Sequence, residues 1–297
     1  MSRKNKGAIK ETSRFAKFFI YIPLILLTIT IIVPVAWVFL ASIKENQEFY
    51  RSPWTLPAGI HLQNFVDAWQ SANMGSYMLN SVFVTAVGIF LLVIIALPAS
   101  YVLARFKFKS GKFWNILFMA GLFINVNYIV VPIFLMLNNG DKLMYQWFGD
   151  TFFMNNLFVL AVVYAATALP FTIYLLSGYF KSLAKDYEEA AYVDGAGYFR
   201  TMVQVIIPMA KPSIVTIILF NFLAFWNEYI ISMTLLTDPK LKTLPVGLMN
   251  LMAAQRSAVQ YGRMYAGLVI VMLPTLILYM LVQKKLTQGM TVGGLKG

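Results

Sequence analysis

The sequence predicts an all-α integral membrane protein with six transmembrane helices. Of its 297 residues, 59% are hydrophobic and only 12% are charged, whereas soluble domains average about 25% charged residues. Six separate apolar windows are each long enough to cross a hydrocarbon core about 30 Å thick, which takes roughly 20 residues of helix. The bilayer is therefore the expected solvent for most of the chain.

The six windows follow one another along the chain, and each contains proline. In a membrane, neighbouring helices and small side chains satisfy the backbone groups that proline leaves without a partner. We therefore expect kinked spans. The predicted spans are 18–41, 82–103, 113–137, 157–178, 205–226 and 264–282.

The distribution of Lys and Arg predicts the orientation of these spans. The amino-terminal segment, the second and fourth connections and the carboxyl-terminal tail hold 17 of the 24 basic residues. Both termini are therefore expected in the cytoplasm, by the positive-inside rule. The formal charge of +12 falls on that side, where it faces anionic lipid, so the charge does not indicate a nucleic-acid partner.

The composition argues against catalysis and against a metal site. The chain has no cysteine, and His61 is its only histidine; a lone histidine in a polar stretch is most often solvated. The predicted spans contain no histidine and no pair of carboxylates, and their serines have no neighbouring base. We therefore expect no enzymatic activity and no metal ligands in this chain.

Charged side chains are almost absent from the predicted spans. Lys211 is the only one within the six windows, and Glu228 follows the fifth. Ion-coupled carriers generally place ionisable groups near the middle of the membrane, so a transporter of this composition is expected to be energised from outside the membrane. A channel stays open as an alternative, although no filter-like loop or charge ring is present.

Polar residues in and beside the spans have two interpretations. Asparagine in a membrane helix commonly forms hydrogen bonds to a neighbouring helix, or its amide lines a path for a neutral polyhydroxyl solute. The sequence leaves both open. The candidate residues of a solute path are Asn125, Asn127, Asn221, Trp226, Asn227 and Glu228.

The connection between the fourth and fifth spans predicts two short helices that form a compact knob (residues 181–207). Residues 184–193 are good helix formers with early acidic groups, and Gly195 is a natural stop. A second helix is expected from residue 198 to about 205, before Pro208. Helical spacing places Leu183, Tyr187, Ala190 and Ala191 near one face, which Glu188 and Glu189 flank.

This knob is better suited to a protein socket than to a membrane surface. Helices that lie on a bilayer usually carry Lys and Arg on one face and large apolar groups on the other. A face of small residues instead allows close approach of a partner, and the flanking carboxylates are able to pair with basic groups on that partner.

The knob also resembles the EAA loop of binding-protein-dependent ATP-binding cassette (ABC) importer permeases. The shared pattern is Glu189-Ala-Ala, three residues, Gly195, nine residues, and then Val-Ile-Ile-Pro208. The family pattern ends in Ile-x-Leu-Pro, so Val205 and Ile207 are conservative departures from it.

Further segments resemble the second permease of maltose-type and multiple-sugar systems, the carbohydrate-uptake branch. They are Asn64-Phe65, Asn80-Ser81, Tyr101 to Phe106, Asp194-Gly-Ala196, Phe225-Trp-Asn-Glu228, Thr243 to Gly247, and the tail Gly289 to Gly297.

The resemblance implies the type I importer permease (MetI-like) fold, whose coupling helix docks in a cleft of an ATPase subunit. The residues that it implies for this coupling are Glu188, Glu189, Ala190, Ala191, Asp194, Gly195 and Pro208. It also implies an extended tail that reaches the ATPase interface through Gly289, Gly293, Gly294 and Lys296.

The resemblance further implies a division into a tail 1–17, a permease domain 18–283 with the coupling loop 181–207, and a tail 284–297. The expected setting is a bacterial or archaeal plasma membrane. The implied partners are a homologous second permease, two ATPase subunits and an extracytoplasmic solute-binding protein that delivers solute to the loops 45–77 and 238–263.

ATP and Mg are expected on the ATPase, because the chain contains no G-x-x-x-x-G-K-[ST] loop. The implied function is passage of a sugar or oligosaccharide across the membrane. The alternatives are a permease of the same architecture for a non-sugar solute, and a self-sufficient channel or secondary carrier.

Overall fold

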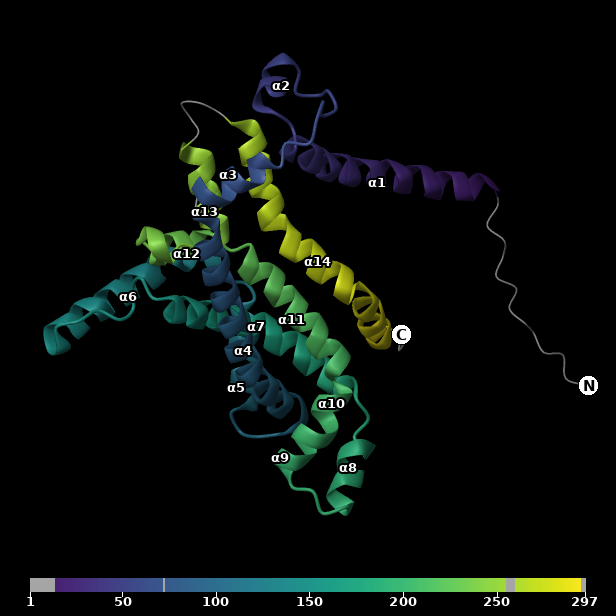
Figure 1. Cartoon of the computed structure of the whole chain (residues 1–297). Helices are drawn as coiled ribbons and strands as arrows, with labels where there is room; N and C mark the ends of the chain where they lie inside the picture. Colours follow the sequence, from purple (N-terminus) through teal and green to yellow (C-terminus); the bar gives the residue numbers. More distant parts are fainter. Residues whose placement is uncertain (1–13, 72, 255–259, 295–297) are drawn as a thin grey trace, which may run out of the picture.

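A computed structural model describes residues 14–71, 73–254 and 260–294, and the regular elements in these ranges are helices (Figure 1). In chain order they are α1 (Arg14–Ser42), α2 (Asn46–Arg51), α3 (Gln63–Ser71), α4 (Met74–Arg105), α5 (Gly111–Gly121), α6 (Val126–Phe148), α7 (Leu157–Ser182), α8 (Asp186–Val193), α9 (Tyr198–Thr201), the π-helical turn η1 (Met202–Ile206), α10 (Ile207–Met209), α11 (Lys211–Trp226), α12 (Ile230–Leu235), the 3-10 turn η2 (Pro239–Leu241), α13 (Leu244–Ala254) and α14 (Tyr261–Gly294).

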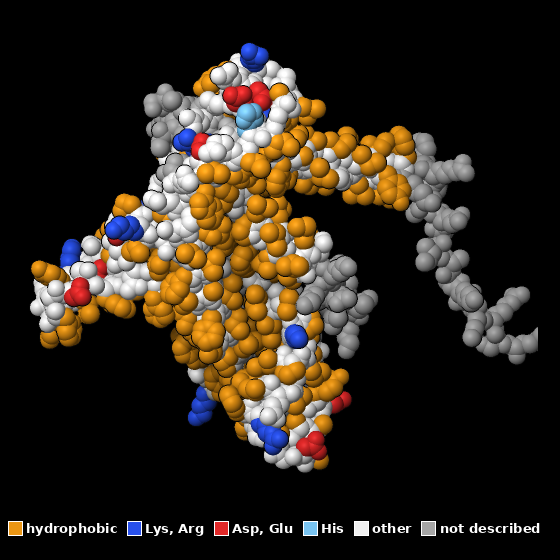
Figure 2. Space-filling view, in the orientation of Figure 1, with side chains coloured by type: hydrophobic (Ala, Val, Ile, Leu, Met, Phe, Trp, Pro, Cys, Tyr) orange, Lys and Arg blue, Asp and Glu red, His pale blue; other side chains and the backbone are white. Residues whose placement is uncertain are grey.

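Four of these helices, α1, α4, α7 and α14, are each long and apolar enough to cross a membrane, as predicted. Half of the most apolar window of α7 is buried, against 6% of that of α1. The helix α7 packs along α4 at the centre of the molecule, while α1 extends away from the body (Figure 1). Figure 2 shows hydrophobic side chains over the middle of the visible face and charged ones gathered toward the ends of the body and of the α6 arm.

The third predicted span, 113–137, is wrong as a single helix. The structure ends α5 at Gly121, and α6 leaves at an angle of 105° after a break of four residues. The side chain of Asn125 accepts a hydrogen bond from the backbone N–H of Asn127 at 3.0 Å, so it caps the first turn of α6. The proline in this region, Pro132, lies inside the continuous helix α6.

The fifth predicted span, 205–226, begins later than expected. Its membrane helix α11 starts at Lys211, and the preceding segment Tyr198–Met209 meets it at an angle of 75°. Pro212 lies in the first turn of α11, where its missing N–H removes no helical hydrogen bond. This proline therefore starts a helix, whereas its place inside the predicted span suggested that it kinks one.

Gly121 marks a close approach between α5 and α7, because a Cβ at this position would lie 2.7 Å from Cγ of Pro170. Neither the proline ring nor the backbone is able to move aside easily, so we expect Gly121→Ala to lower the free energy of unfolding by about 1–2 kcal/mol. Gly178→Ala in α7 is the control, because its Cβ would meet nothing within 4 Å. That variant should be about 1 kcal/mol more stable through helix propensity. Thermal unfolding in detergent measures both changes. Equal unfolding midpoints for Gly121→Ala and the natural chain would contradict the close contact between Gly121 and Pro170.

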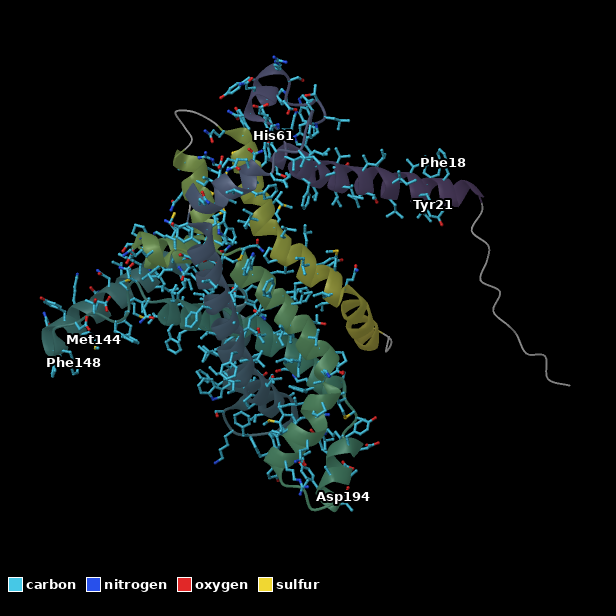
Figure 3. All side chains as sticks on the ribbon, viewed as in Figure 1. Phe18, Tyr21, His61, Met144, Phe148 and Asp194 are labelled. Atoms are coloured by element: carbon cyan, nitrogen blue, oxygen red, sulfur yellow. The ribbon has the colours of Figure 1, made fainter. Side chains whose placement is uncertain are left out.

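The polar segments collect at two opposite ends of the molecule. The first end, here called the loop end, comprises α2, α3, α13 and the loops within residues 45–77 and 238–263, as far as these are described. The other end is the knob, with α8 and α9 (Figure 1). Figure 3 shows the same separation, with His61 at the loop end and Asp194 at the tip of the knob. The loop end and the knob are therefore separate polar surfaces at opposite ends of the molecule.

Candidate functional site

The first helix of the knob forms where the sequence predicts it, beginning two residues later. Asp186, Glu188 and Glu189 lie in the first turn of α8, where their negative charge complements the positive end of the helix dipole. The helix ends at Val193, just before the predicted stop.

Gly195 closes α8 through a left-handed turn with φ +78°. Its backbone N–H donates to the carbonyl of Tyr192 at 3.0 Å, and the N–H of Ala196 donates to the carbonyl of Ala191 at 2.9 Å. These two bonds form a Schellman motif, in which a glycine accepts the left-handed conformation without a clash. The motif fixes the direction in which the chain leaves α8.

The second half of the knob is less regular than expected. The predicted helix from residue 198 to about 205 is present as α9 followed by the π-helical turn η1. Such turns are rare and are often found at functional sites. The hydroxyl of Tyr179 donates to the carbonyl of Met209 at 3.1 Å, so α7 holds the end of this segment in place.

The two faces of α8 differ from the predicted arrangement. Glu188 and Ala191 are buried, 8% exposed each, whereas Tyr187, Glu189 and Ala190 are exposed. The prediction that Ala191 belongs to an open small-residue face, flanked by an accessible Glu188, is therefore wrong as to their exposure. Both are covered because α8 packs against η1 and α9 and because Arg105 of α4 reaches Glu188. The exposed face carries Glu189, Ala190 and Val193.

Glu188 forms a buried ion pair with the last residue of α4. Its Oε1 lies 3.1 Å from Nε of Arg105, and the two side chains are 10% and 5% exposed. The atoms do not have the alignment of a hydrogen bond, so the attraction is electrostatic. Arg105 also donates through Nη2 to the carbonyl of Leu183 at 2.9 Å. One guanidinium thus joins α4, the end of α7 and α8.

Aromatic rings pack around the junction of α4, α7 and α8 that Arg105 forms. Tyr101 of α4 makes edge contacts with Phe180 of α7 at 5.8 Å and with Phe106 at 5.6 Å between ring centroids. Phe106 contacts Tyr198 at 5.4 Å, and Tyr198 contacts Tyr192 of α8 at 5.5 Å. Edge-to-face contacts of this kind stabilise beyond the area that they bury. The rings therefore form an unbroken path from α7 through α4 to the knob.

Tyr192 of α8 lies at the edge of this junction and is 39% exposed. Burial raises the pKa of its phenol above the ordinary value, and the neighbouring Glu188 carboxylate raises it further. Both effects disfavour the charged form. Tyr192 is therefore a neutral group beside the Glu188 carboxylate, although its ring is partly open to solvent.

Two of the predicted solute-path residues lie in the interior. Asn221 is 3% exposed and donates to Oγ1 of Thr172 at 3.2 Å and to the carbonyl of Ile217 at 2.9 Å. Trp226 is 2% exposed, and its Nε1 donates to the carbonyl of Val271 at 3.2 Å. Interhelical hydrogen bonding, one of the two interpretations of Asn221, is therefore confirmed. Neither side chain is open to a solute in this chain, because α11 packs between α7 and α14.

The other predicted path residues divide in two. The amide of Asn227 donates to the carbonyl of Leu223 at 2.7 Å, within its own helix. Glu228 accepts hydrogen bonds from the hydroxyl of Tyr164 at 2.8 Å and from the backbone N–H of Ile231 at 2.8 Å, so it fastens α7 to α12. Asn125 and Asn127 are exposed at the break between α5 and α6, and their part in a solute path stays a prediction.

Two of the segments that resemble the carbohydrate-uptake branch lie far apart in the sequence but contact each other in the structure. Asn80 donates to the carbonyls of Lys240 and Lys242 at 3.0 Å each, and the hydroxyl of Ser81 accepts from the N–H of Leu244 at 2.8 Å. The Asn80-Ser81 pair thus holds the segment around Thr243. These residues have a structural role that their motif alone did not reveal.

Lys44 is a buried residue of the loop end that the sequence did not single out. Its side chain is fully buried, and Nζ donates to the carbonyls of Ser52, Pro53 and Thr55 at 3.4, 3.2 and 2.7 Å. The ammonium also lies 5.0 Å from the ring centroid of Phe49. One lysine therefore organises the loop that follows α2.

His61 was expected to be solvated, and it is 42% exposed beside Glu45, with 3.8 Å between Nε2 and Oε2. Glu45, Glu48 and His61 each offer a metal-ligating atom within 4.8 Å of the others. However, Glu48 already accepts from the N–H groups of Glu45 and Ala58, and the bond from Ala58 lowers the pKa of its carboxyl. These contacts explain the cluster as a loop closure.

The tail differs from its predicted extended form. The helix α14 continues through Gly289, Gly293 and Gly294, because each glycine weakens a helix by only about 1 kcal/mol. Lys296 lies outside the described residues. The predicted contact of the tail with an ATPase is not tested by these observations.

Comparison with known proteins matches residues 96–292 to the family described as binding-protein-dependent transport system inner membrane component. The "Diacetylchitobiose uptake system permease protein NgcG" of Streptomyces coelicolor is 34% identical over 97% of this chain and 91% of its own length. The "Probable ABC transporter permease protein YurM" of Bacillus subtilis is 34% identical over 99% and 91%.

Two further similarities extend over nearly the whole chain. The "Trehalose/maltose transport system permease protein MalG" of Thermococcus litoralis is 28% identical over 92% of this chain and 94% of its own length. A chain in the crystal structure of a bacterial ABC transporter involved in the import of the polysaccharide alginate superposes with a TM-score of 0.77, covering 92% of this chain and 98% of that chain at 23% identity. This last similarity shows the fold.

Proposed function

Because the chain belongs to the family of inner membrane components of binding-protein-dependent transport systems, we propose that it is a permease subunit of an ABC importer that passes a sugar or oligosaccharide across the plasma membrane. It is a multi-pass membrane protein. We choose a sugar as the solute because the chain is similar, over nearly its full length, to permeases named for diacetylchitobiose and for trehalose and maltose.

The proposed energy source is a separate ATPase that docks on the knob. In support, the knob projects from the end of the molecule opposite the loop end, and its exposed face combines the carboxylate of Glu189 with small Ala190 and apolar Val193. Val193 is 87% exposed, so an apolar side chain at the end of α8 is accessible to a partner. ATP and Mg are bound by that partner in this proposal.

The remaining proposed partners are a homologous permease and an extracytoplasmic solute-binding protein. The nearly uncovered helix α1 and the broken third span leave apolar faces for lipid and for a second permease. The excess of Lys and Arg in the connections beside the knob supports a cytoplasmic position for it. The loop end then faces the binding protein outside the cell.

Reconstitution tests this function directly. The purified chain, its partner permease and the ATPase are placed in proteoliposomes with the binding protein, and uptake of radiolabelled oligosaccharides is followed with and without ATP. We expect uptake only with both ATP and the binding protein. Uptake without nucleotide would instead establish a channel or secondary carrier, and ATP-dependent uptake of amino acids but not sugars would refute the proposed solute.

Docking of the ATPase on the knob makes a separate prediction about adjacent alanines. The natural chain has no cysteine, so a single introduced thiol reports one position. We expect Ala190→Cys to form a crosslink to the ATPase at least about ten times more efficiently than Ala191→Cys, because Ala190 is exposed whereas Ala191 is buried. Crosslinking is measured in native vesicles with a reagent that joins a maleimide to a photoreactive benzophenone, which needs no thiol on the ATPase. Equal crosslinking at both positions, or none at either, would exclude this docking face.

A further inference from the structure

The knob is joined to the membrane helices by two routes of different stiffness. Along the backbone, α8 and α9 lead to α11 through the π-helical turn η1, the short α10 and a bend of 75° next to Ala210. Across the interior, α8 meets the end of α4 through the ion pair between Glu188 and Arg105. The bent route is poorly suited to transmit a push along α11, because neither the turn nor the bend is a straight helix.

The interior route is short and enclosed. Both charged side chains are at least nine-tenths buried, so little water screens their attraction. Removing either partner would leave a buried charge without its counter-ion, which is strongly unfavourable. Arg105 also binds the carbonyl of Leu183 at the end of α7. The pair therefore holds α8 at a fixed angle to two packed membrane helices.

From this geometry we propose that Arg105 and Glu188 are positioning residues that make the knob move as one body with α4 and α7. This inference rests on the proposed function, in which an ATPase drives the knob. The chain of rings from Phe180 through Tyr101 to Tyr192 and Tyr198 supports the same junction. Movement of α8 is passed to α4 by the charge pair, and rigid-body displacements of this kind convert a local push into a change of helix packing.

The test separates positioning from simple folding. Arg105→Gln, Glu188→Gln and the charge exchange Arg105→Glu with Glu188→Arg are assembled with the ATPase and partner permease in nanodiscs and proteoliposomes. Lys112→Gln, which removes an exposed charge from the same connection, is the matched control. The readouts are sugar molecules imported per ATP hydrolysed, measured on unlabelled protein, and the distance distribution between spin labels on Ala190→Cys and Lys109→Cys, measured on separate samples.

We expect each neutral variant to broaden the label distribution and to lower import per ATP at least about ten-fold, while ATP hydrolysis continues. The charge exchange should restore a narrow distribution and at least about a third of the import ratio. Should Arg105→Gln not assemble, Glu188→Gln carries the same expectation, since the isosteric amide keeps its volume.

Unaltered label distances and import ratios in both neutral variants would overturn the positioning role. If the natural complex itself shows no ATP-dependent import, the proposed function fails instead. The label distances still report the junction in that case, because they require no transport.

Discussion

Replacing Gly195 with valine is expected to abolish ATP-driven import while the protein still inserts and assembles. The residue has a φ of +78°, a conformation that costs a residue with a Cβ roughly 1–2 kcal/mol and is a clear outlier for a β-branched one. A Cβ there would meet nothing within 4 Å, so the strain arises in the backbone. Relief of that strain breaks the Schellman motif and turns the exposed face of α8 away from its partner.

Two other glycines provide controls for this substitution. Gly197 also has open space around its Cβ position, but its φ of −76° is ordinary, so Gly197→Ala should keep normal import. Gly149, with φ +72° and equally open space, ends α6 far from the knob. Gly149→Val should therefore carry similar strain without uncoupling import from ATP hydrolysis.

Import of radiolabelled sugar in proteoliposomes and the yield of assembled complex on size-exclusion chromatography decide the outcome for Gly195→Val. Import at the natural rate would show that the direction set by the Schellman motif is not needed. Loss of the assembled complex together with import would show a folding defect, as would equal losses in Gly149→Val.

Removing the charge of Lys44 should produce the largest loss of stability at the loop end. Lys44→Met keeps most of the side-chain volume but leaves the carbonyls of Ser52, Pro53 and Thr55 without their donor. Hydrogen bonds to charged groups contribute about 1.5–3 kcal/mol each, and the net cost is reduced because a loop at the surface can regain water. We therefore expect a loss of roughly 3 kcal/mol in the free energy of unfolding.

Denaturant unfolding in detergent measures this loss, and Lys240→Met is the control because that lysine is exposed. The loop after α2 should also become accessible, so Ser52→Cys, at a partly buried position of that loop, should react with a maleimide several times faster in the Lys44→Met background than in the natural background. Unchanged stability and unchanged reactivity would mean that the buried ammonium does not hold the loop.

The membrane architecture was largely predictable, because it depends on local properties of the chain. Four spans follow from unbroken apolar stretches, and the short helix α8 follows from helix formers, early acidic groups and Gly195. The third span was mispredicted because hydropathy, a local property, carries no information about the break in it. A hydropathy window continues across residues 122–125, but the break depends on a cap at Asn125 and on the contact of Gly121 with Pro170.

The roles of individual site residues were much less predictable. Asn221 was open between a solute path and an interhelical bond, and Thr172 on another helix decided it. The two adjacent glutamates of α8 were treated alike, yet Glu188 points inward to Arg105 whereas Glu189 is exposed. An eight-residue helix with polar and small residues on both sides has no apolar stripe to say which side is buried.

By itself the sequence determined that the chain crosses a membrane, where its basic excess lies, and where a capped knob interrupts the spans. Hydropathy, charge and capping act over a few neighbouring residues, so they can be read along the chain. Only the tertiary structure decided which carboxylate of the knob is buried and which helices it joins. An ion pair exists only when two distant segments meet in space, and the packing of α4, α7 and α8 brings Arg105 and Glu188 together.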